Sequence, residues 1–150
     1  MLQDRVILNP IGGYILIRSR VFETLKSYTQ TGNRPEAGGI LLGSYRGVHL
    51  EITDATTPFP TDKSSRNHFN RLSKGHQEYA EQIWSTSSRL VTYIGEWHTH
   101  PIPSPNPSHQ DVISWTRDLP SRNMLLLIQG LSDVYIGIHS PTTGLISVPE

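Results

Sequence analysis

The chain has 150 residues, of which 35% are hydrophobic and 17% charged, and its 13 basic and 13 acidic residues give a formal net charge of zero. We expect residues 1–150 to form a single domain, because this length is typical of one compact unit with its own core. The sequence contains no basic stripe, so its charge does not suggest a nucleic-acid partner. The absence of cysteine excludes disulfides, thiolate metal ligands and cysteine nucleophiles, and fits a cytoplasmic protein. We expect neither a signal peptide nor a membrane span, which needs about 20 apolar residues.

The first third of the chain is predicted to contain a strand, a helix and a hairpin. The run YILI at residues 14–17 favours a strand, and apolar residues take helical spacing from Ser19, a candidate N-cap. Residues 38–55 (GGILLGSYRGVHLEITDA) indicate two strands joined by a turn at Arg46–Gly47.

The middle of the chain is more polar. Pro58–Arg71 is interrupted by prolines, and we expect a loop or insertion there. Residues 73–89 predict a second helix with Tyr79, Ile83 and Trp84 on its inward face.

The last part alternates strands with one more helix. Strands are predicted at 90–97, 123–130, 133–140 and 144–150, with a helix at 108–120 that ends at or before Pro120. The strand at 123–130 is apolar enough to be buried on both faces. This order predicts an α/β fold with a mixed β-sheet flanked by helices.

One stretch concentrates residues that carry chemistry: EWHTHPIPSPNPSHQD, from Glu96 to Asp111. Side chains two apart on a strand share a face, so His98 and His100 can grip one metal ion. Pro101 favours an extended backbone at His100, and four prolines stiffen the loop that follows.

Ser108 opens the predicted third helix, and Asp111 lies on the same side of it three residues later. Asp111 can therefore supply a third ligand to the same ion. Three protein ligands and one open position are typical of catalytic zinc, which lowers the pKa of its water to about 7. Ser108 and Asp111 also match a variant of the helix capping box, which alone would explain them.

The remaining histidines carry no such pattern. Each is more typical of an ordinary surface or core side chain than of a ligand: His49, His68, His76 and His139.

The stretch HTHPIPSPNPSHQD resembles the JAMM motif of the JAB/MPN metalloprotease family, which is H-x-H-P, six residues and S-x-x-D. The family also has a glutamate before a GxLLG-type strand, and PEAGGILLG places it at Glu36. The resemblance implies a JAB/MPN, cytidine-deaminase-like architecture. With only RDLPSRN after the third helix, the chain is most similar to short bacterial members in antiviral defence operons with E1/E2-like conjugating enzymes.

The resemblance also implies what each residue does. His98, His100 and Asp111 would hold one zinc ion per chain. Glu36 would take a proton from the zinc-bound water and deliver it to the leaving amine. Ser108 would donate a hydrogen bond to the developing oxyanion.

Three further residues lie near the motif. Glu96 shares the strand face of His98 and is a rival for the general base. Trp97 is expected to point the other way into the core, and Trp115 to pack beneath the metal site.

The implied reaction is hydrolysis of the amide bond after the C-terminal tail of a ubiquitin-like protein or of a conjugated bacterial defence protein. Such tails commonly bind by adding a strand to a sheet edge. Within Pro58–Arg71, four side chains either meet a partner or form a solvated surface: Lys63, Arg66, Phe69 and Arg71.

The alternative functions are a processing protease for a sulfur-carrier or ubiquitin-like precursor, and a non-catalytic MPN-type scaffold. The full ligand set argues against the scaffold. A metal-dependent nuclease is disfavoured by the lack of a basic groove, and a zinc deaminase by the lack of cysteine.

Overall fold

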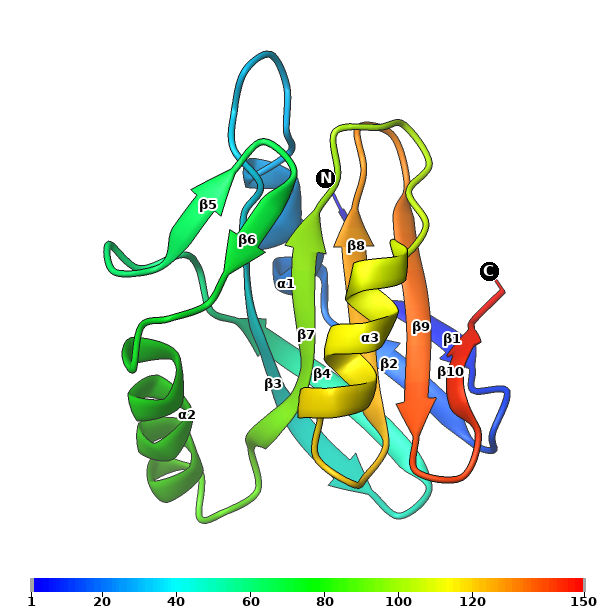
Figure 1. Cartoon of the computed structure of the whole chain (residues 1–150). Helices are drawn as coiled ribbons and strands as arrows, with labels where there is room; N and C mark the ends of the chain where they lie inside the picture. The colour runs from blue at the N-terminus through cyan, green and yellow to red at the C-terminus, as the bar shows by residue number, and fades with distance from the viewer. Residues whose placement is uncertain (1, 150) are drawn as a thin grey trace.

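The computed structural model describes residues 2–149 and confirms the predicted mixed sheet flanked by helices (Figure 1). The helices are α1 (Ser19–Ser27), α2 (Gly75–Thr86) and α3 (His109–Asp118). The strands are β1 (Arg5–Leu8), β2 (Tyr14–Ile17), β3 (Gly38–Arg46), β4 (His49–Ala55), β5 (Lys63–Ser65), β6 (His68–Asn70), β7 (Thr92–Thr99), β8 (Met124–Gln129), β9 (Val134–Ser140) and β10 (Gly144–Ser147). The main sheet has the order β1-β2-β4-β3-β7-β8-β9-β10, in which only the β2–β4 and β7–β8 pairs are parallel.

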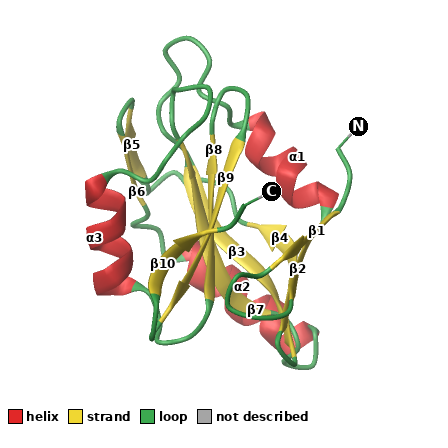
Figure 2. Ribbon diagram, turned by 90° about the vertical axis from the view of Figure 1, so that its right-hand side faces the viewer, coloured by secondary structure: helices red, strands yellow, loops and turns green. Residues whose placement is uncertain are grey.

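Strand β8 shows how the core is divided. All six of its residues are buried, as its apolar sequence predicted. Leu125 and Leu127 join the core that includes α1, whereas Leu126 and Ile128 pack with Trp115 of α3. Figure 2 shows α1 and α3 on opposite sides of the sheet. The apolar packing of Trp115 thus fixes α3, the helix that carries Asp111, against the sheet.

Helix α1 begins at Ser19, one residue earlier than an N-cap at Ser19 would require. Arg18 occupies the N-cap position and its side chain makes no capping bond. Instead the carboxylate of Asp4 accepts the backbone N–H of Ser19 at 2.7 Å. Ser19 is therefore wrong as the cap, because a residue 15 positions away satisfies the helix end.

The Pro58–Arg71 segment, predicted as a loop or insertion, contains a short hairpin. Its second half forms β5 and β6, which pair antiparallel as a separate hairpin. The backbone N–H of Glu36 donates to the carbonyl of Ser65 at 2.7 Å, so the hairpin is joined directly to the segment before β3.

Helix α2 is present, but its predicted inward face is partly wrong. Tyr79 is 39% exposed and Trp84 is 41% exposed, while Ile83 is half-buried. The buried residue of this helix is His76. A histidine can be buried there because Asp62 and Thr56 bond both of its ring nitrogens.

Strand β1 was not predicted. Its exposed positions carry the apolar side chains of Val6 and Leu8, so the sequence lacks the polar–apolar alternation of a half-buried strand. Across residues 2–149, no helix combines the length and apolar character that a membrane crossing requires.

Candidate metal centre and active site

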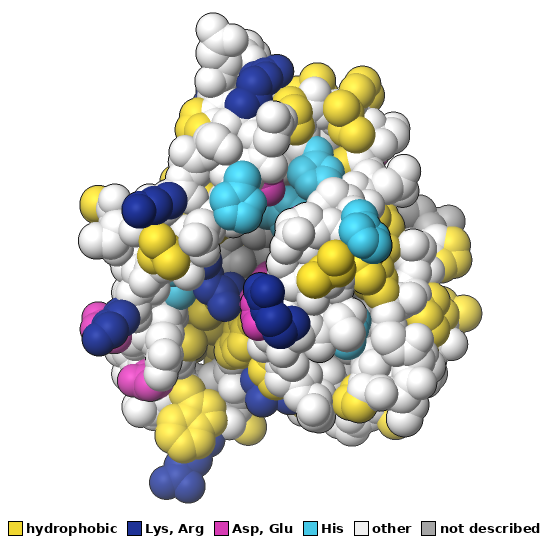
Figure 3. Space-filling view, in the orientation of Figure 1, with side chains coloured by type: hydrophobic (Ala, Val, Ile, Leu, Met, Phe, Trp, Pro, Cys, Tyr) yellow, Lys and Arg dark blue, Asp and Glu magenta, His cyan; other side chains and the backbone are white. Residues whose placement is uncertain are grey.

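A cleft of about 420 Å³ lies between hairpin β5–β6 and helix α3, with residues of β7 along it. Figure 3 shows histidine side chains gathered around a hollow on this face. Every residue that the sequence predicted for the site lines this one cleft: Glu36, His98, His100, Ser108 and Asp111. The structure thus brings together side chains from the segment before β3, from β7 and the residue after it, and from the start of α3.

The two imidazoles meet as the strand periodicity predicted. His98 lies in β7 beside Ile128 of β8, and the backbone N–H of His100 donates to the carbonyl of Gln129 at 3.0 Å. The extended pairing therefore continues past the end of β7. It leaves Nε2 of His98 3.2 Å from Nε2 of His100.

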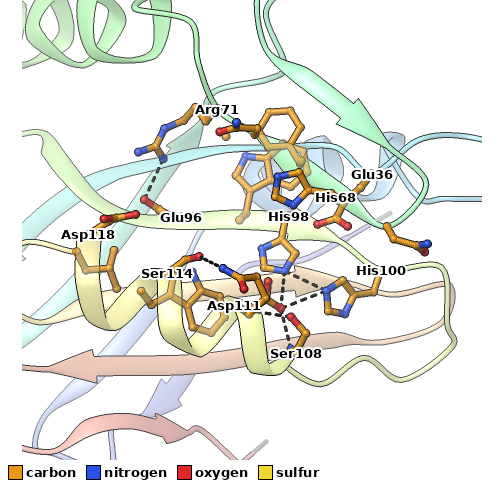
Figure 4. Close-up of a pocket in the computed structure, with 18 of the residues that line it drawn as sticks. Glu36, His68, Arg71, Glu96, His98, His100, Ser108, Asp111, Ser114 and Asp118 are labelled. Carbon is orange, nitrogen blue, oxygen red and sulfur yellow. Dashed lines mark hydrogen bonds and ion pairs between the residues drawn. The ribbon is translucent and has the colours of Figure 1, made fainter.

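Asp111 completes a triangle with these two nitrogens. Its Oδ2 lies 3.2 Å from Nε2 of His98 and 3.3 Å from Nε2 of His100 (Figure 4). The capping box is also present: Ser108 Oγ accepts the N–H of Asp111 at 3.0 Å, and Asp111 Oδ2 accepts the N–H of Ser108 at 2.8 Å. The two interpretations of S-x-x-D therefore coexist in one arrangement.

The proline-rich loop between His100 and Ser108 is anchored to the β8–β9 turn. The N–H of Leu131 donates to the carbonyl of Ile102 at 2.8 Å, and Ser132 and Asp133 both donate to the carbonyl of Pro103 at 3.0 Å. These bonds fix the first part of the loop that returns the chain from β7 to α3, the helix that carries Asp111.

Glu36 lies on the other side of the imidazoles and is 6% exposed. Its carboxylate and the ring nitrogens of His98 and His100 lie within 4.8 Å of one another, which makes the three a candidate metal site. Burial raises the pKa of the Glu36 carboxyl to about 7, against the opposing attraction of His98 and His100. Glu36 is thus a carboxyl group suited to accept and release a proton near neutral pH.

The pKa of Asp111 is shifted in the opposite direction, downward. Burial works against its ionisation, but the contacts with His100 and His98 outweigh burial and hold the pKa of this carboxyl well below its usual range. A carboxylate that stays ionised is suited to hold a metal, whereas one that titrates near pH 7 is suited to acid–base chemistry. The two carboxyl groups therefore differ in what they can do.

Glu96, the rival for the base, is occupied elsewhere. Its Oε2 accepts hydrogen bonds from Arg71 Nη1 at 3.0 Å and from the Tyr93 hydroxyl at 2.7 Å. It lies in the cleft on the face of His98, as predicted, but one of its two carboxylate oxygens is held by Arg71 and Tyr93.

The tryptophans lie where the strand and helix periods predicted. Trp97 is 2% exposed in the core, and its Nε1 donates to the carbonyl of Thr56 at 2.8 Å. The buried ring of Trp115 lies 5.8 Å from the ring of His98, so it packs beneath the imidazoles.

Sequence reasoning missed one group that lines the cleft. His68, treated as an ordinary histidine, lies on β6 and lines the cleft with Asn67 and Asn70. No sequence pattern marks these residues, because only the pairing of β5 with β6 brings them over the site.

Comparisons with known proteins identify the family to which the chain belongs. The family model described as prokaryotic homologs of the JAB domain matches residues 18–143. Relatives named CD-NTase/cGAS isopeptidase are 35% identical over 138 residues in Escherichia coli and 40% identical over 119 residues in Pseudomonas aeruginosa. These alignments cover 91% of this chain and 88% of the first relative, and 76% and 75% for the second.

A third relative of the same name, from Vibrio cholerae, is 38% identical over 125 residues, covering 82% of this chain and 80% of its own. The solution structure of protein DSY2949 from Desulfitobacterium hafniense superposes with a TM-score of 0.65 at 18% identity, covering 87% of both chains, and shows the same fold. The chain therefore belongs to the prokaryotic JAB domain family, and it is an isopeptidase of that family.

Proposed function

We propose that residues 1–150 act as one domain and hydrolyse the amide bond joining the C-terminal tail of a CD-NTase/cGAS-type or ubiquitin-like protein to a conjugated partner. The names of the relatives support the substrate class. The observation that carries the chemistry is the convergence of His98, His100 and Asp111 on one point of the cleft. The proposed setting is a cytoplasmic defence system with E1/E2-like conjugating enzymes.

The proposed cofactor is one zinc ion held by these three side chains. Ligand atoms about 2.0–2.1 Å from zinc in tetrahedral directions lie about 3.3 Å from each other. The observed separations among His98 Nε2, His100 Nε2 and Asp111 Oδ2 are 3.2, 3.2 and 3.3 Å. Two imidazoles and an ionised carboxylate at these spacings fit the group.

When bound, zinc would lower the pKa of a water molecule to near neutral and would itself polarise the carbonyl of the bond to be cut. Glu36 is proposed to take that proton on its carboxylate and pass it to the nitrogen of the leaving lysine side chain. Its burial supports this, because a buried carboxyl with a pKa near 7 exchanges protons readily at working pH.

Ser108 is proposed to donate a hydrogen bond to the oxyanion that forms on the attacked carbonyl. Its Oγ accepts the backbone N–H of Asp111, which leaves the hydroxyl hydrogen available as a donor. Helix capping and oxyanion stabilisation therefore use different parts of one hydroxyl.

Hairpin β5–β6 is proposed to form the wall against which the substrate tail lies. Of the four hairpin residues singled out by sequence, Phe69 and Arg71 are among the described residues that line the cleft, whereas Lys63 and Arg66 are not. This favours substrate contact for the first pair and a solvated surface for the second.

The test pairs metal content with cleavage. Purified protein should contain about one zinc per chain. It should also cleave a conjugate in which the C-terminus of a CD-NTase or of a ubiquitin-like protein is linked to a lysine side chain. Glu36→Gln should keep the zinc and lose turnover, whereas Ser44→Ala, a change at a buried hydroxyl of β3, controls for general damage.

A linear fusion through the same C-terminal tail separates the alternatives. Cleavage of the fusion alone would favour precursor processing over deconjugation. Protein with neither zinc nor cleavage would favour the scaffold, and turnover by a clean Glu36→Gln preparation would remove Glu36 as the base.

A further inference from the structure

Two buried polar side chains behind the site take no part in the chemistry proposed above. Thr99 is 0% exposed and Gln30 is 1% exposed. Thr99 stands between His98 and His100, so its side chain points to the opposite face of the extended chain. The Thr99 hydroxyl donates to Oε1 of Gln30 at 2.8 Å and accepts the N–H of Ala37, the residue after Glu36, at 2.9 Å.

Gln30 extends this connection to the hairpin. Its Nε2 donates to the carbonyl of Arg66 in the β5–β6 turn at 2.9 Å and to the carbonyl of Arg34 at 3.3 Å. Arg66 in turn donates from Nη1 to the carbonyl of Gly32 at 2.6 Å. One buried amide therefore joins the hairpin, the segment leading to Glu36 and the residue between the two histidines.

The carboxylate of Glu36 depends on these contacts for its place. Within residues 2–149, no side chain donates a hydrogen bond to that carboxylate, so its position is set by the backbone on either side. The N–H of Glu36 donates to the carbonyl of Ser65 at 2.7 Å, and the N–H of Ala37 donates to the Thr99 hydroxyl. The N–H of Thr99 returns a bond to the carbonyl of Ala37 at 3.0 Å.

We propose that Gln30 and Thr99 are positioning residues that hold Glu36 at its working distance from His98 and His100. The inference rests on the proposed function, in which Glu36 is the base. Gln30 fixes the hairpin turn, the hairpin fixes the N–H of Glu36 through Ser65, and Thr99 fixes the next N–H. A displacement of about 1 Å at a reacting group costs up to about 10²-fold in rate.

The first test separates the Thr99 hydroxyl from its bulk. Thr99→Val keeps the shape but removes the donor and acceptor, and it should lower kcat by roughly 10- to 100-fold with KM within about twofold. Thr99→Ser restores the hydroxyl and should recover most of kcat. Both variants should keep one zinc per chain, and Ser44→Ala, which removes a hydroxyl bond to the carbonyl of Leu90, is the matched control.

The second test needs neither metal nor substrate. Amide hydrogen exchange in the zinc-free protein should be about tenfold faster at Glu36 and Ala37 in Gln30→Met, although Gln30 bonds to neither amide. The double variant Gln30→Met/Thr99→Val should be no slower in kcat than the worse single variant, because residues that act as a unit are not additive.

Three results would overturn the proposal: normal kcat in folded, zinc-loaded Thr99→Val; Thr99→Ser as slow as Thr99→Val; or unchanged exchange at Glu36 and Ala37 in Gln30→Met. Failure of the proposed function is distinguishable, because it would appear as a wild-type protein that cleaves no conjugate. The exchange measurement in Gln30→Met would still decide whether Gln30 holds this segment.

Discussion

Asp62 and His76 form a buried pair in which Oδ2 of the carboxylate lies 2.6 Å from Nε2 of the imidazole, and each side chain is 2% exposed. Thr56 Oγ1 lies 2.6 Å from the other ring nitrogen, Nδ1, and already accepts the N–H of Ile40 at 2.9 Å. An ionised Asp62 carboxylate can only accept, so Nε2–H donates to Asp62, and in a neutral imidazole Nδ1 then accepts the hydrogen of the Thr56 hydroxyl. The arrangement suits a neutral imidazole that ties α2 to the segment before the hairpin.

This pair predicts a loss of stability in mild acid. Burial lowers the pKa of His76 below its ordinary 6.5, against the raising effect of Asp62. Between the folded pKa and 6.5 the unfolded chain binds more protons, so the free energy of unfolding falls as pH falls through that window. Urea unfolding at pH 7 and pH 5 should show a larger loss for the wild type than for His76→Gln.

Equal losses in the two proteins would show that His76 is not the group responsible. Asp62 does not act in the same window. Burial raises its pKa, but bonds from the N–H groups of Phe59 and Ser73 and from His76 outweigh burial, so the net shift is downward from 3.8. The stability that ionised Asp62 contributes to the folded protein is lost only below about pH 4.

Ser108→Ala should separate turnover from metal binding. Loss of one oxyanion donor typically lowers kcat by about 10²-fold, and loss of a helix cap costs about 1 kcal/mol of stability. Zinc should remain, because Ser108 is not one of the converging ligands. Kinetics, zinc analysis and urea unfolding on one preparation check all three; a variant that loses zinc would make Ser108 structural first.

Zinc removal should be visible in tryptophan fluorescence. The ring of Trp115 lies 5.8 Å from the ring of His98, and Asp111 one turn earlier caps the same helix through Oδ2. Chelation should therefore change the Trp115 emission, and added zinc should restore it. Trp115→Phe should lack the signal, and His98→Ala should show no response to zinc. A full response in Trp115→Phe would place its origin in another tryptophan.

The turn after α2 offers a stabilising change. Ser88 has a φ of 58°, the left-handed region in which a side chain costs roughly 1–2 kcal/mol and glycine little. Ser88→Gly should raise the free energy of urea unfolding by about 1 kcal/mol. Ser87→Gly is the contrasting control and should destabilise, because Ser87 has a φ of −92° and its Oγ accepts the N–H of Val91. A loss in Ser88→Gly would contradict this account.

What the sequence could predict was local. His98 and His100 share a face because a strand alternates, and Ser108 and Asp111 meet because a helix turns, so spacing alone was sufficient. The apolar run of β8 was equally clear, since burial on both faces leaves no polar position in its centre.

What the sequence could not predict depended on partners far along the chain. Strand β5 is exposed at all three residues, so it carries no apolar alternation. In α2, His76 is buried and Tyr79 and Trp84 are exposed. Asp62 and Thr56 bond the ring of His76, and no helical pattern reveals these distant partners. The raised pKa of the Glu36 carboxyl likewise comes from burial in the folded protein rather than from its neighbours in sequence.

The placement of the site between two separate surface elements has a topological consequence. An isopeptide linkage is a branch point from which three chain arms leave, and none of them needs to end nearby. A tunnel would require a free end to be threaded through it. A groove with α3 on one side and the hairpin on the other admits a branch from the side, so two folded partners can remain folded while the bond between them is reached.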